Sequence, residues 1–412
     1  GRYFKGKSTK FVPGKTKILT ASPTYGVEEI AEATDSLLST NVTMGKKVKM
    51  FENMFAKYIG VNHGVMVNSG SSANLLAMSA LTSPSIKDGL KVGDEVITPA
   101  VTWATTLYPI SDVGAVPVIV DVNPNTYNID LQQVEQAITN KTRAIFLVHL
   151  LGAPCDMHAL ERILKKHDLF LIEDCCEAHG AMFDGRKVGS FGHISTFSFY
   201  YSHHIATIEG GMLLTNIPEF SELAKCMRAF GWIRDLQNRD ALAKRYPNLD
   251  PRFLFVNHGY CLRPTEIQGA FGIHQLKKLE GFIEVREQNA KYWNDALAKF
   301  GDYLQLPHED TYARNVWFGY PLTVNPDAPF SRDEIVNELE KKNIETRPIM
   351  AGNITEQPVM KYLKNRTVGN LPNARMIDAN SFFFGNHHGI GEAEREYIVH
   401  CISEFIKSKV RN

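Results

Sequence analysis

Short apolar runs alternate with amphipathic stretches between about residues 65 and 216. Each apolar run is bounded by polar or turn-forming residues, as is typical of strands. The runs are DEVITP (94–99), VPVIVDV (116–122), RAIFLVHL (143–150), LFLIEDC (169–175), STFSFY (195–200) and GMLLTN (211–216). The intervening stretches repeat apolar residues every three to four positions, as helices do. They are SSANLLAMSALT (71–82), LQQVEQAIT (131–139), MHALERILKKHD (157–168) and PEFSELAKCMRAF (218–230). This alternation predicts an α/β fold with a mostly parallel central sheet covered on both faces.

The pattern becomes more mixed toward the C-terminus. Its expected elements are a long helix (264–300), a strand (315–324), a helix (331–343) and a final helix (392–408). Ser331 is the expected N-cap of the third of these elements. We therefore expect an N-terminal segment (1–30), a large domain (31–285) and a smaller α+β C-terminal domain (286–412).

The charge balance excludes several classes of partner. Lysine plus arginine and aspartate plus glutamate both number 45, so no field of one sign favours nucleic acid or an anionic membrane. No apolar run is long enough to span a bilayer. The first residues, GRYFKGKSTKF, lack the apolar core of a signal peptide. We expect a cytoplasmic protein.

The six cysteines do not indicate a metal site or a disulfide framework. They are Cys155, Cys175, Cys176, Cys226, Cys261 and Cys401. Their spacing lacks the pairs of a zinc site, and their density is far below that of a disulfide scaffold. Adjacent residues at a strand end also point in opposite directions, so Cys175 and Cys176 cannot both face one metal. We expect reduced, mostly buried thiols and no metal.

Candidate chemistry lies where the expected strands end, which is where open α/β sheets bind ligands. After the run VMVNSG, the residues Gly70, Ser71 and Ser72 form a strand-to-helix turn. Backbone N–H groups and the helix dipole at such a turn bind phosphate. An ordinary capped helix start is an equally good interpretation of this stretch taken alone.

Two further strand ends carry an aromatic residue and acids. Trp103 could stack on a flat heterocycle or simply pack against its neighbours. Asp174 ends a strongly apolar run, where a carboxylate needs a cation or several donors as partners. A protonated pyridine nitrogen would be such a cation, and a helix N-cap is the competing role. Glu177 lies within reach of the same place.

The stretch STFSFYYSHHIATIEGGML (195–213) contains Ser198, His203 and His204 but no lysine. Neighbouring side chains on an extended segment point in opposite directions, so one histidine can face a site while the other packs. The sequence suggests no third ligand nearby, which makes a metal role for this pair weak.

These segments together resemble the DegT/DnrJ/StrS family of sugar aminotransferases, which have the fold-type I aspartate aminotransferase architecture. The resemblance covers nearly the whole chain. Its motifs include SGSSANL, TPAVTWATT, LVHLLGAPCDM, IEDCCEAHGA, GSFGHISTFSFYYSHH, IEGGML and GYCLRPTEIQGA. It implies that Gly70, Ser71 and Ser72 hold the phosphate of pyridoxal 5′-phosphate (PLP). It also implies that Trp103 stacks on the cofactor ring, that Asp174 faces the pyridine nitrogen, and that Ser198 lies near the phosphate.

Three positions depart from the family pattern. His203 stands where the family has its cofactor-binding lysine, Glu177 replaces a glutamine, and Cys261 replaces an asparagine that reaches the neighbouring subunit's cofactor. The first two changes occur together in a small branch of nucleotide-sugar 3-dehydratases. That resemblance implies removal of the 3-hydroxyl of a 4-keto-6-deoxy hexose, with GDP-4-keto-6-deoxymannose as substrate and L-glutamate as amino donor. It further implies a homodimer, noncovalent PLP or pyridoxamine phosphate, and a place in dideoxysugar synthesis for lipopolysaccharide O-antigen.

Histidine suits this chemistry because it moves protons near neutral pH but forms no stable imine. His203 is therefore the expected catalytic residue. Two alternatives remain open from the sequence. One is a reductive CDP-4-keto-6-deoxyglucose 3-dehydrase with an iron–sulfur cluster, which the scattered cysteines disfavour. The other is an aminotransferase-like protein that binds ligands without turnover, which the retained Trp103 and Asp174 disfavour.

Overall fold

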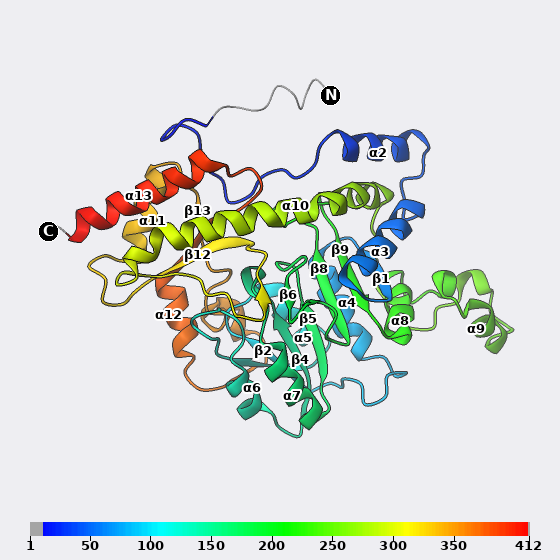
Figure 1. The fold of residues 1–412 in the computed structure, drawn as a ribbon. Helices are drawn as coiled ribbons and strands as arrows, with labels where there is room; N and C mark the ends of the chain where they lie inside the picture. The colour runs from blue at the N-terminus through cyan, green and yellow to red at the C-terminus, as the bar shows by residue number, and fades with distance from the viewer. Residues whose placement is uncertain (1–10, 411–412) are drawn as a thin grey trace.

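A computed structural model describes residues 11–410, which form a large mixed sheet, two smaller sheets and the helices that cover them (Figure 1). The expectation drawn from the first ten residues, that they include no signal peptide, lies outside the described residues. The large sheet has eight strands in the order β1-β9-β8-β5-β4-β2-β3-β14. Their bounds are β1 (His63–Val67), β2 (Glu95–Pro99), β3 (Val116–Val120), β4 (Thr142–Val148), β5 (Phe170–Asp174), β8 (Ile194–Ser198), β9 (Gly211–Thr215) and β14 (Arg366–Thr367).

The sheet is parallel from β14 through β8, and antiparallel only where β9 joins β8 and β1. The mostly parallel α/β fold expected from the sequence is thus confirmed. Strands β2, β3, β5 and β8 are buried on both faces, which explains their continuous apolar runs. Apolar side chains of α4 (Gly70–Leu81) and α8 (Pro218–Arg228) pack on one face of the sheet. Those of α6 (Leu131–Ala137) and α7 (Met157–His167) pack on the other.

The α-helices between residues 11 and 410 include all seven that the periodicity predicts, together with five that were not predicted. Their bounds are α2 (Val27–Leu38), α3 (Lys46–Ile59), α4 (Gly70–Leu81), α5 (Ala104–Asp112), α6 (Leu131–Ala137), α7 (Met157–His167), α8 (Pro218–Arg228), α9 (Arg239–Arg245), α10 (Glu266–Leu297), α11 (Arg332–Lys341), α12 (Pro372–Asn380) and α13 (Glu392–Val410). Ser331 caps α11 as expected, and its side chain accepts a hydrogen bond from the backbone N–H of Glu334. Thr265 and Gln268 form the same reciprocal box at the start of α10.

The small sheet is antiparallel, in the order β10-β12-β15-β13, and packs against α10, α11 and α13. Its strands are β10 (Leu304–Gln305), β12 (Gly319–Val324), β15 (Ser381–Gly385) and β13 (Thr346–Pro348). A further three-stranded sheet consists of β11 (Ala313–Arg314), β6 (Met182–Phe183) and β7 (Arg186–Lys187). Residue 285, the expected domain boundary, lies inside α10, because this helix runs along both parts of the molecule.

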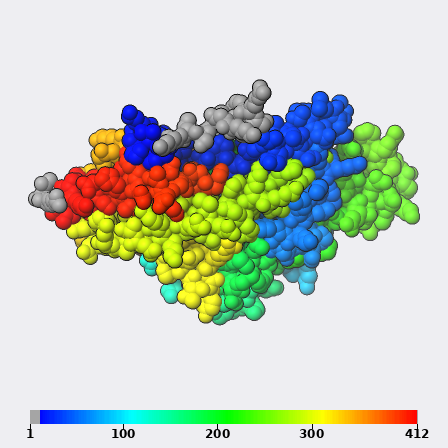
Figure 2. Space-filling view, turned by 45° about the horizontal axis from the view of Figure 1, so that its top comes forward, coloured from blue at the N-terminus to red at the C-terminus, as the bar shows by residue number. Residues whose placement is uncertain are grey.

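The N-terminal segment crosses the C-terminal part of the chain. Ile18 forms a bridge with Ile344, and Figure 2 shows the blue segment lying along the yellow-green α10 and the red α13. Between residues 11 and 410, no helix combines the length and the apolar character that crossing a membrane requires. Helices cover both faces of the large sheet. The candidate site lies at the carboxyl ends of its parallel strands.

Candidate active site

A cavity of about 800 Å³ opens at the carboxyl ends of β5 and β8, beside the N-terminus of α4. Small-sheet residues such as Arg347 and Phe383 line its opposite side. Seven of the eight residues expected from the sequence line this cavity. They are Gly70, Ser71, Trp103, Asp174, Glu177, Ser198 and His203. The eighth, Ser72, is not among the lining residues. Its backbone N–H donates to the side chain of Ser69, the N-cap of α4.

The start of α4 and the end of β8 approach each other at a glycine. A Cβ atom at Gly70 would overlap the side chain of Ser198, so only glycine fits between the turn and the strand. Ser71 is fixed from the other side by a hydrogen bond from its hydroxyl to Thr105 Oγ1, at 3.2 Å. The first turn of α4 thus presents backbone N–H groups and hydroxyls to one end of the cavity, which suits a phosphate.

Asp174 is buried at the end of β5, and its carboxylate accepts three hydrogen bonds. Oδ2 accepts from Asn74 Nδ2 at 2.9 Å and from Thr106 Oγ1 at 2.8 Å, and Oδ1 accepts from the N–H of Cys176 at 3.1 Å. These donors satisfy both oxygens of the buried carboxylate. The carboxylate has no cation partner in the part of the chain that the structure describes. It is therefore suited to a cationic ring nitrogen entering from the cavity.

Asn74 and Thr106 were not expected from the sequence. Asn74 lies inside α4 and Thr106 inside α5, where polar residues usually face solvent. Their side chains instead converge on Asp174. Both residues are far from Asp174 in the sequence, so no local pattern indicates this contact. The amide of Asn74 is held in place because its Oδ1 accepts from Thr196 Oγ1 at 2.6 Å. This orientation directs the amide nitrogen at the carboxylate.

Glu177 is also buried, but its carboxyl group has poorer hydrogen bonding than that of Asp174. One oxygen accepts from the backbone N–H of Leu151 at 2.7 Å. Burial, and secondarily the nearby charge of Asp174, raise the pKa of Glu177 to about 8. The two carboxyl groups of this site therefore have different roles. Asp174 carries the negative charge, and Glu177 holds a proton at neutral pH and can donate a hydrogen bond.

The raised pKa of Glu177 predicts a pH-dependent gain in stability for Glu177→Gln. Wild-type protein loses the contribution of this group as the pH rises from about 4.5 to about 8, since the folded state binds the proton more tightly. Glutamine does not ionise, so its advantage over glutamate should grow by a few kcal/mol between pH 5 and pH 9, each pKa unit corresponding to about 1.4 kcal/mol. Urea unfolding of both proteins without cofactor measures this difference. An equal difference at the two pH values would show that Glu177 ionises normally.

His203 lines the cavity from the loop between β8 and β9, and the adjacent His204 does not. The ring of His204 is buried, with Nε2 at 2.9 Å from the carbonyl oxygen of Val316. The ring of His203 packs against Phe318, with centroids 5.3 Å apart, and its Nδ1 is buried without a hydrogen-bond partner among the described residues. Burial, with a smaller contribution from the charge of Arg286, lowers the pKa of His203 to about 3. The imidazole is neutral at physiological pH and can accept a proton.

Aromatic side chains form the mouth of the cavity. Trp103 is 56% exposed at the start of α5, and Tyr200 and Tyr201 are also exposed there. The indole has little packing against its own chain, which leaves a flat face for a ring that enters the cavity. Of the residues that line the cavity, none is a lysine. A cofactor here would be held without a bond to a lysine.

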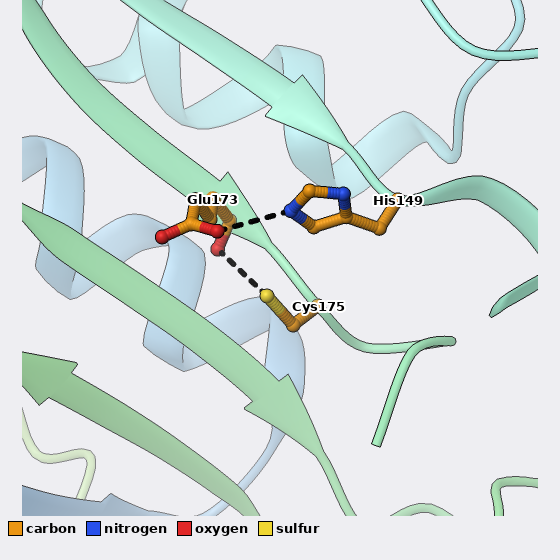
Figure 3. A group of neighbouring side chains, drawn as sticks. All are labelled: His149, Glu173 and Cys175. Atoms are coloured by element: carbon orange, nitrogen blue, oxygen red, sulfur yellow. Dashed lines mark hydrogen bonds and ion pairs between the residues drawn. The ribbon is translucent and has the colours of Figure 1, made fainter. Parts of the chain in front are cut away.

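A second group of polar residues lies behind Asp174, fully buried: His149, Glu173 and Cys175 (Figure 3). His149 Nε2 is 3.1 Å from Glu173 Oε2, and Nδ1 of the same ring accepts the N–H of Cys155. The Glu173 carboxylate also accepts three backbone N–H groups of the 189–192 loop. Burial raises the pKa of the Cys175 thiol well above its usual value. The donors are already satisfied and the thiol is neutral, so this group orders the end of β5 and is unsuited to a metal.

A pyridine ring that carries a phosphate fits the cavity. Backbone N–H groups at α4 suit the phosphate, the Asp174 carboxylate suits a protonated ring nitrogen, and the exposed Trp103 suits the face of the ring. The roles of Gly70, Ser198 and the other candidate residues remain predictions, whereas their convergence on one cavity is a feature of the structure.

Comparisons with known proteins agree with this arrangement. The model of the DegT/DnrJ/EryC1/StrS aminotransferase family matches residues 23–403. GDP-4-keto-6-deoxy-D-mannose 3-dehydratase of Escherichia coli O55:H7 is 41% identical over 370 residues, which are 89% of this chain and 94% of that protein. A solved structure of the E. coli enzyme with bound hydrated PLP superposes with a TM-score of 0.89 at 40% identity, covering 93% of this chain and 98% of the other. A structure of a GDP-4-keto-6-deoxymannose 3-dehydratase with a trapped PLP-glutamate geminal diamine has a TM-score of 0.89 at 39% identity and covers 93% of this chain and 99% of the other.

Proposed function

The chain belongs to the DegT/DnrJ/EryC1/StrS aminotransferase family, and from this premise we propose that it is a PLP-dependent nucleotide-sugar 3-dehydratase. The proposed substrate is GDP-4-keto-6-deoxymannose, from which the 3-hydroxyl is removed with L-glutamate as amino donor. One observation carries the proposal: a histidine, and no lysine, lines the cavity that holds the other cofactor-binding candidates. The similarity of about 40% to enzymes named for this reaction supports it.

The residues that would hold the cofactor lie around the cavity. The start of α4 and Ser198 would bind the phosphate, Asp174 would pair with the ring nitrogen, and Trp103 would cover one face of the ring. Glu177, protonated at neutral pH, can donate a hydrogen bond to an oxygen on the ring. When bound, the cofactor supplies an amino group that can combine with the sugar ketone and a cationic ring that withdraws electrons from it.

His203 would move the proton. The neutral imidazole accepts a proton from the carbon that bears the cofactor's amino group. Because its pKa is low, the imidazolium formed is a strong acid and passes the proton to the departing 3-hydroxyl. The overall reaction then balances: sugar ketone and glutamate yield the 3-deoxy sugar, 2-oxoglutarate and ammonia. A lysine amine at the same place would favour simple amino transfer.

Arg347 is the candidate for binding glutamate. Among the residues that line the cavity, it is the single arginine. It forms an ion pair with Glu345 at 2.6 Å, and the other oxygen of Glu345 accepts the N–H of Thr20. The guanidinium is more than half exposed, so an incoming carboxylate can share it. The cavity thus offers a cation on strand β13 of the small sheet, whereas the proposed phosphate site lies at the start of α4.

Replacing Arg347 with methionine should raise the KM for glutamate by roughly 10- to 100-fold, as expected when a charge-assisted pair worth about 1.5–3 kcal/mol is lost. The release of 2-oxoglutarate without sugar measures this step alone. The matched control is Arg375→Met, which removes an exposed guanidinium that pairs with Glu356 and does not line the cavity. Equal KM values for the two variants would remove Arg347 from glutamate binding.

The proposed function is tested by mixing the protein with PLP, glutamate and GDP-4-keto-6-deoxymannose. Formation of a 4-keto-3,6-dideoxy sugar, 2-oxoglutarate and ammonia in equal amounts is the expected result. Retention of nitrogen in the sugar would indicate an aminotransferase, and no turnover would indicate a ligand-binding protein. Iron–sulfur absorbance in the visible range would support the reductive alternative, which the structure disfavours because Cys155, Cys226 and Cys401 are buried on separate elements. Glutamate and nucleotide sugars imply the cytoplasm as the site of the reaction.

We also propose that the enzyme is a homodimer. The segment around α9 stands away from the body of the molecule in Figure 1 and exposes large apolar side chains. They are Phe230, Tyr246, Leu249, Phe253, Phe255 and Val256. A second copy of this chain, as the family resemblance implies, would cover them. Light scattering should give twice the mass of one chain, and a monomer with full activity would contradict the dimer.

A further inference from the structure

Arg286, in the middle of α10, is a buried arginine without a carboxylate partner. Only 3% of it is exposed, and it forms no ion pair with any described residue. Its Nη1 donates to the backbone carbonyls of Trp317 and Phe318, both at 3.0 Å, and to that of Asn386. Burial lowers the pKa of Arg286 to about 9, so the group is still charged at neutral pH.

Burying a charge of this kind is costly, because carbonyl dipoles replace only part of its hydration. Arg314 on β11 differs in this respect, because it pairs with the α10 carboxylates of Glu280 and Glu287 near the surface. The single charge of Arg286 instead remains inside the protein, where the effective dielectric constant is low and its field extends to neighbouring groups.

Two of the three carbonyls bound by Arg286, those of Trp317 and Phe318, belong to a strained turn. Trp317 has a positive φ of 51°, which is uncommon for a residue with a bulky side chain. The turn is also paired with residues 151–152, since Val316 donates to the carbonyl of Gly152 and Phe318 to that of Leu151. Leu151 in turn donates to Glu177. Arg286 therefore stabilises a turn that connects directly to the candidate site.

The same turn contacts both histidines of the β8–β9 loop. Phe318 packs on the ring of His203 with centroids 5.3 Å apart, and on the ring of His204 at 6.1 Å. The carbonyl of Val316 accepts from His204 Nε2 when that nitrogen carries the proton. The arginine thus determines where the wall behind His203 lies.

The titratable groups around His203 give it a cationic or neutral environment on its buried side. They are Arg286 on α10, His179 after β5 and His204 on its own loop. The acids Asp174, Glu177, Glu209 and Glu345 also line the cavity. Burial, and the charge of Arg286 in addition, lower the pKa of His179, His203 and His204.

We propose that Arg286 is a positioning residue for the dehydration site. Its guanidinium holds Phe318 against His203, and its unpaired charge adds to the effect of burial on the imidazole, which stays neutral and can accept a proton. This inference rests on the proposed function of His203 as the proton carrier. The guanidinium does not touch the cavity, and it acts through the turn and through its field.

Two substitutions separate the charge of Arg286 from its hydrogen bonds. Arg286→Lys keeps a buried cation, whereas Arg286→Gln keeps a donor to the carbonyls and removes the charge. The holoenzyme is labelled with ¹³C-histidine, and the signal of His203 is identified by its loss in a His203→Asn sample. In the glutamine variant, the midpoint of His203 protonation should rise by about one pH unit or more. In the lysine variant it should stay within a few tenths of a unit of wild type.

The activity profile gives a second readout. The acid limb of kcat/KM should move to higher pH in Arg286→Gln, because a larger fraction of His203 is protonated at a given pH. Arg286→Lys should keep the acid limb and lose about tenfold or more in kcat at every pH, since a flexible ammonium lacks the fixed planar geometry with which the guanidinium holds the carbonyls. A wild-type His203 midpoint in the glutamine variant would overturn the role of the charge. A raised His203 midpoint in the lysine variant would also overturn the role of the charge. This second test is available even if the glutamine variant does not fold.

These readouts distinguish the inference from the function on which it rests. The histidine titration is measured without turnover, so it can fail while the enzyme is a dehydratase. Conversely, a shifted titration in a protein that does not dehydrate any sugar would leave the coupling of Arg286 to His203 intact and refute the proposed function alone. Full kcat in both variants would overturn the positioning of Phe318.

Discussion

Replacing His203 with asparagine should lower the rate of dehydration by roughly 10³-fold, within the usual contribution of general acid–base catalysis. Asparagine occupies a similar volume but cannot take up a proton. No lysine lines the cavity to take over this step. The side chains proposed to bind the cofactor are unchanged, so cofactor affinity should stay within a few-fold of wild type.

Product formation, measured by chromatography of the nucleotide sugars, tests this expectation, and a titration of the apoprotein with PLP tests binding. His158→Asn is the matched control. It removes a half-exposed histidine whose ion pair with Asp184 lies on the surface, where such pairs contribute little. If His203→Asn kept a rate within tenfold of wild type, the proton would have to travel through another group, and Glu177 would be the next candidate.

The regular part of the fold could be predicted from the sequence because its signals are local. Strands β2, β4 and β5 are continuous apolar runs, and α7 and α11 show both periodicity and side-chain caps. Strand β14, by contrast, contains two residues and joins the edge of the large sheet from far along the chain. A pairing of that length has no periodicity, so only tertiary structure reveals it.

Some residues of the candidate site could likewise be predicted from the sequence, and others could not. Gly70 and Asp174 could be identified because each ends or follows an apolar run, and the structure brings both to one cavity. Arg286 could not be identified, since a cation in a long polar-rich helix usually faces solvent. Its burial results from where α10 crosses the turn that contains Trp317, about 30 residues later. Such residues are recognised only when the packing is known.

The contrast between Asp174 and Glu177 explains how one cavity can hold both a charged and a neutral carboxyl group. Three donors converge on Asp174, whereas Glu177 receives one. Burial with a single donor raises the pKa of Glu177, and the nearby charge of Asp174 adds to this effect. The sequence places both acids at the end of β5, but only the number of donors assigns their states.

Asp174→Asn should therefore weaken cofactor binding by about 10²-fold or more and lower turnover at least as much. The substitution removes the negative charge proposed to pair with the ring nitrogen, an interaction worth roughly 1.5–3 kcal/mol. The new amide NH₂ would also face donors, because Asn74, Thr106 and the N–H of Cys176 all point at this group. A donor left unsatisfied in a buried site costs a further ~1–3 kcal/mol.

Thr106→Val is the matched control, since it removes one of those donors and leaves the carboxylate in place. It should weaken binding by only about tenfold, and the ultraviolet–visible spectrum of bound PLP should resemble that of the wild type. The asparagine variant should also bring the pKa of Glu177 closer to its usual value, because the neighbouring charge is lost. If Asp174→Asn bound the cofactor as tightly as Thr106→Val, the ring nitrogen would not depend on this carboxylate. The cofactor would then be held by the start of α4 and by Trp103 alone.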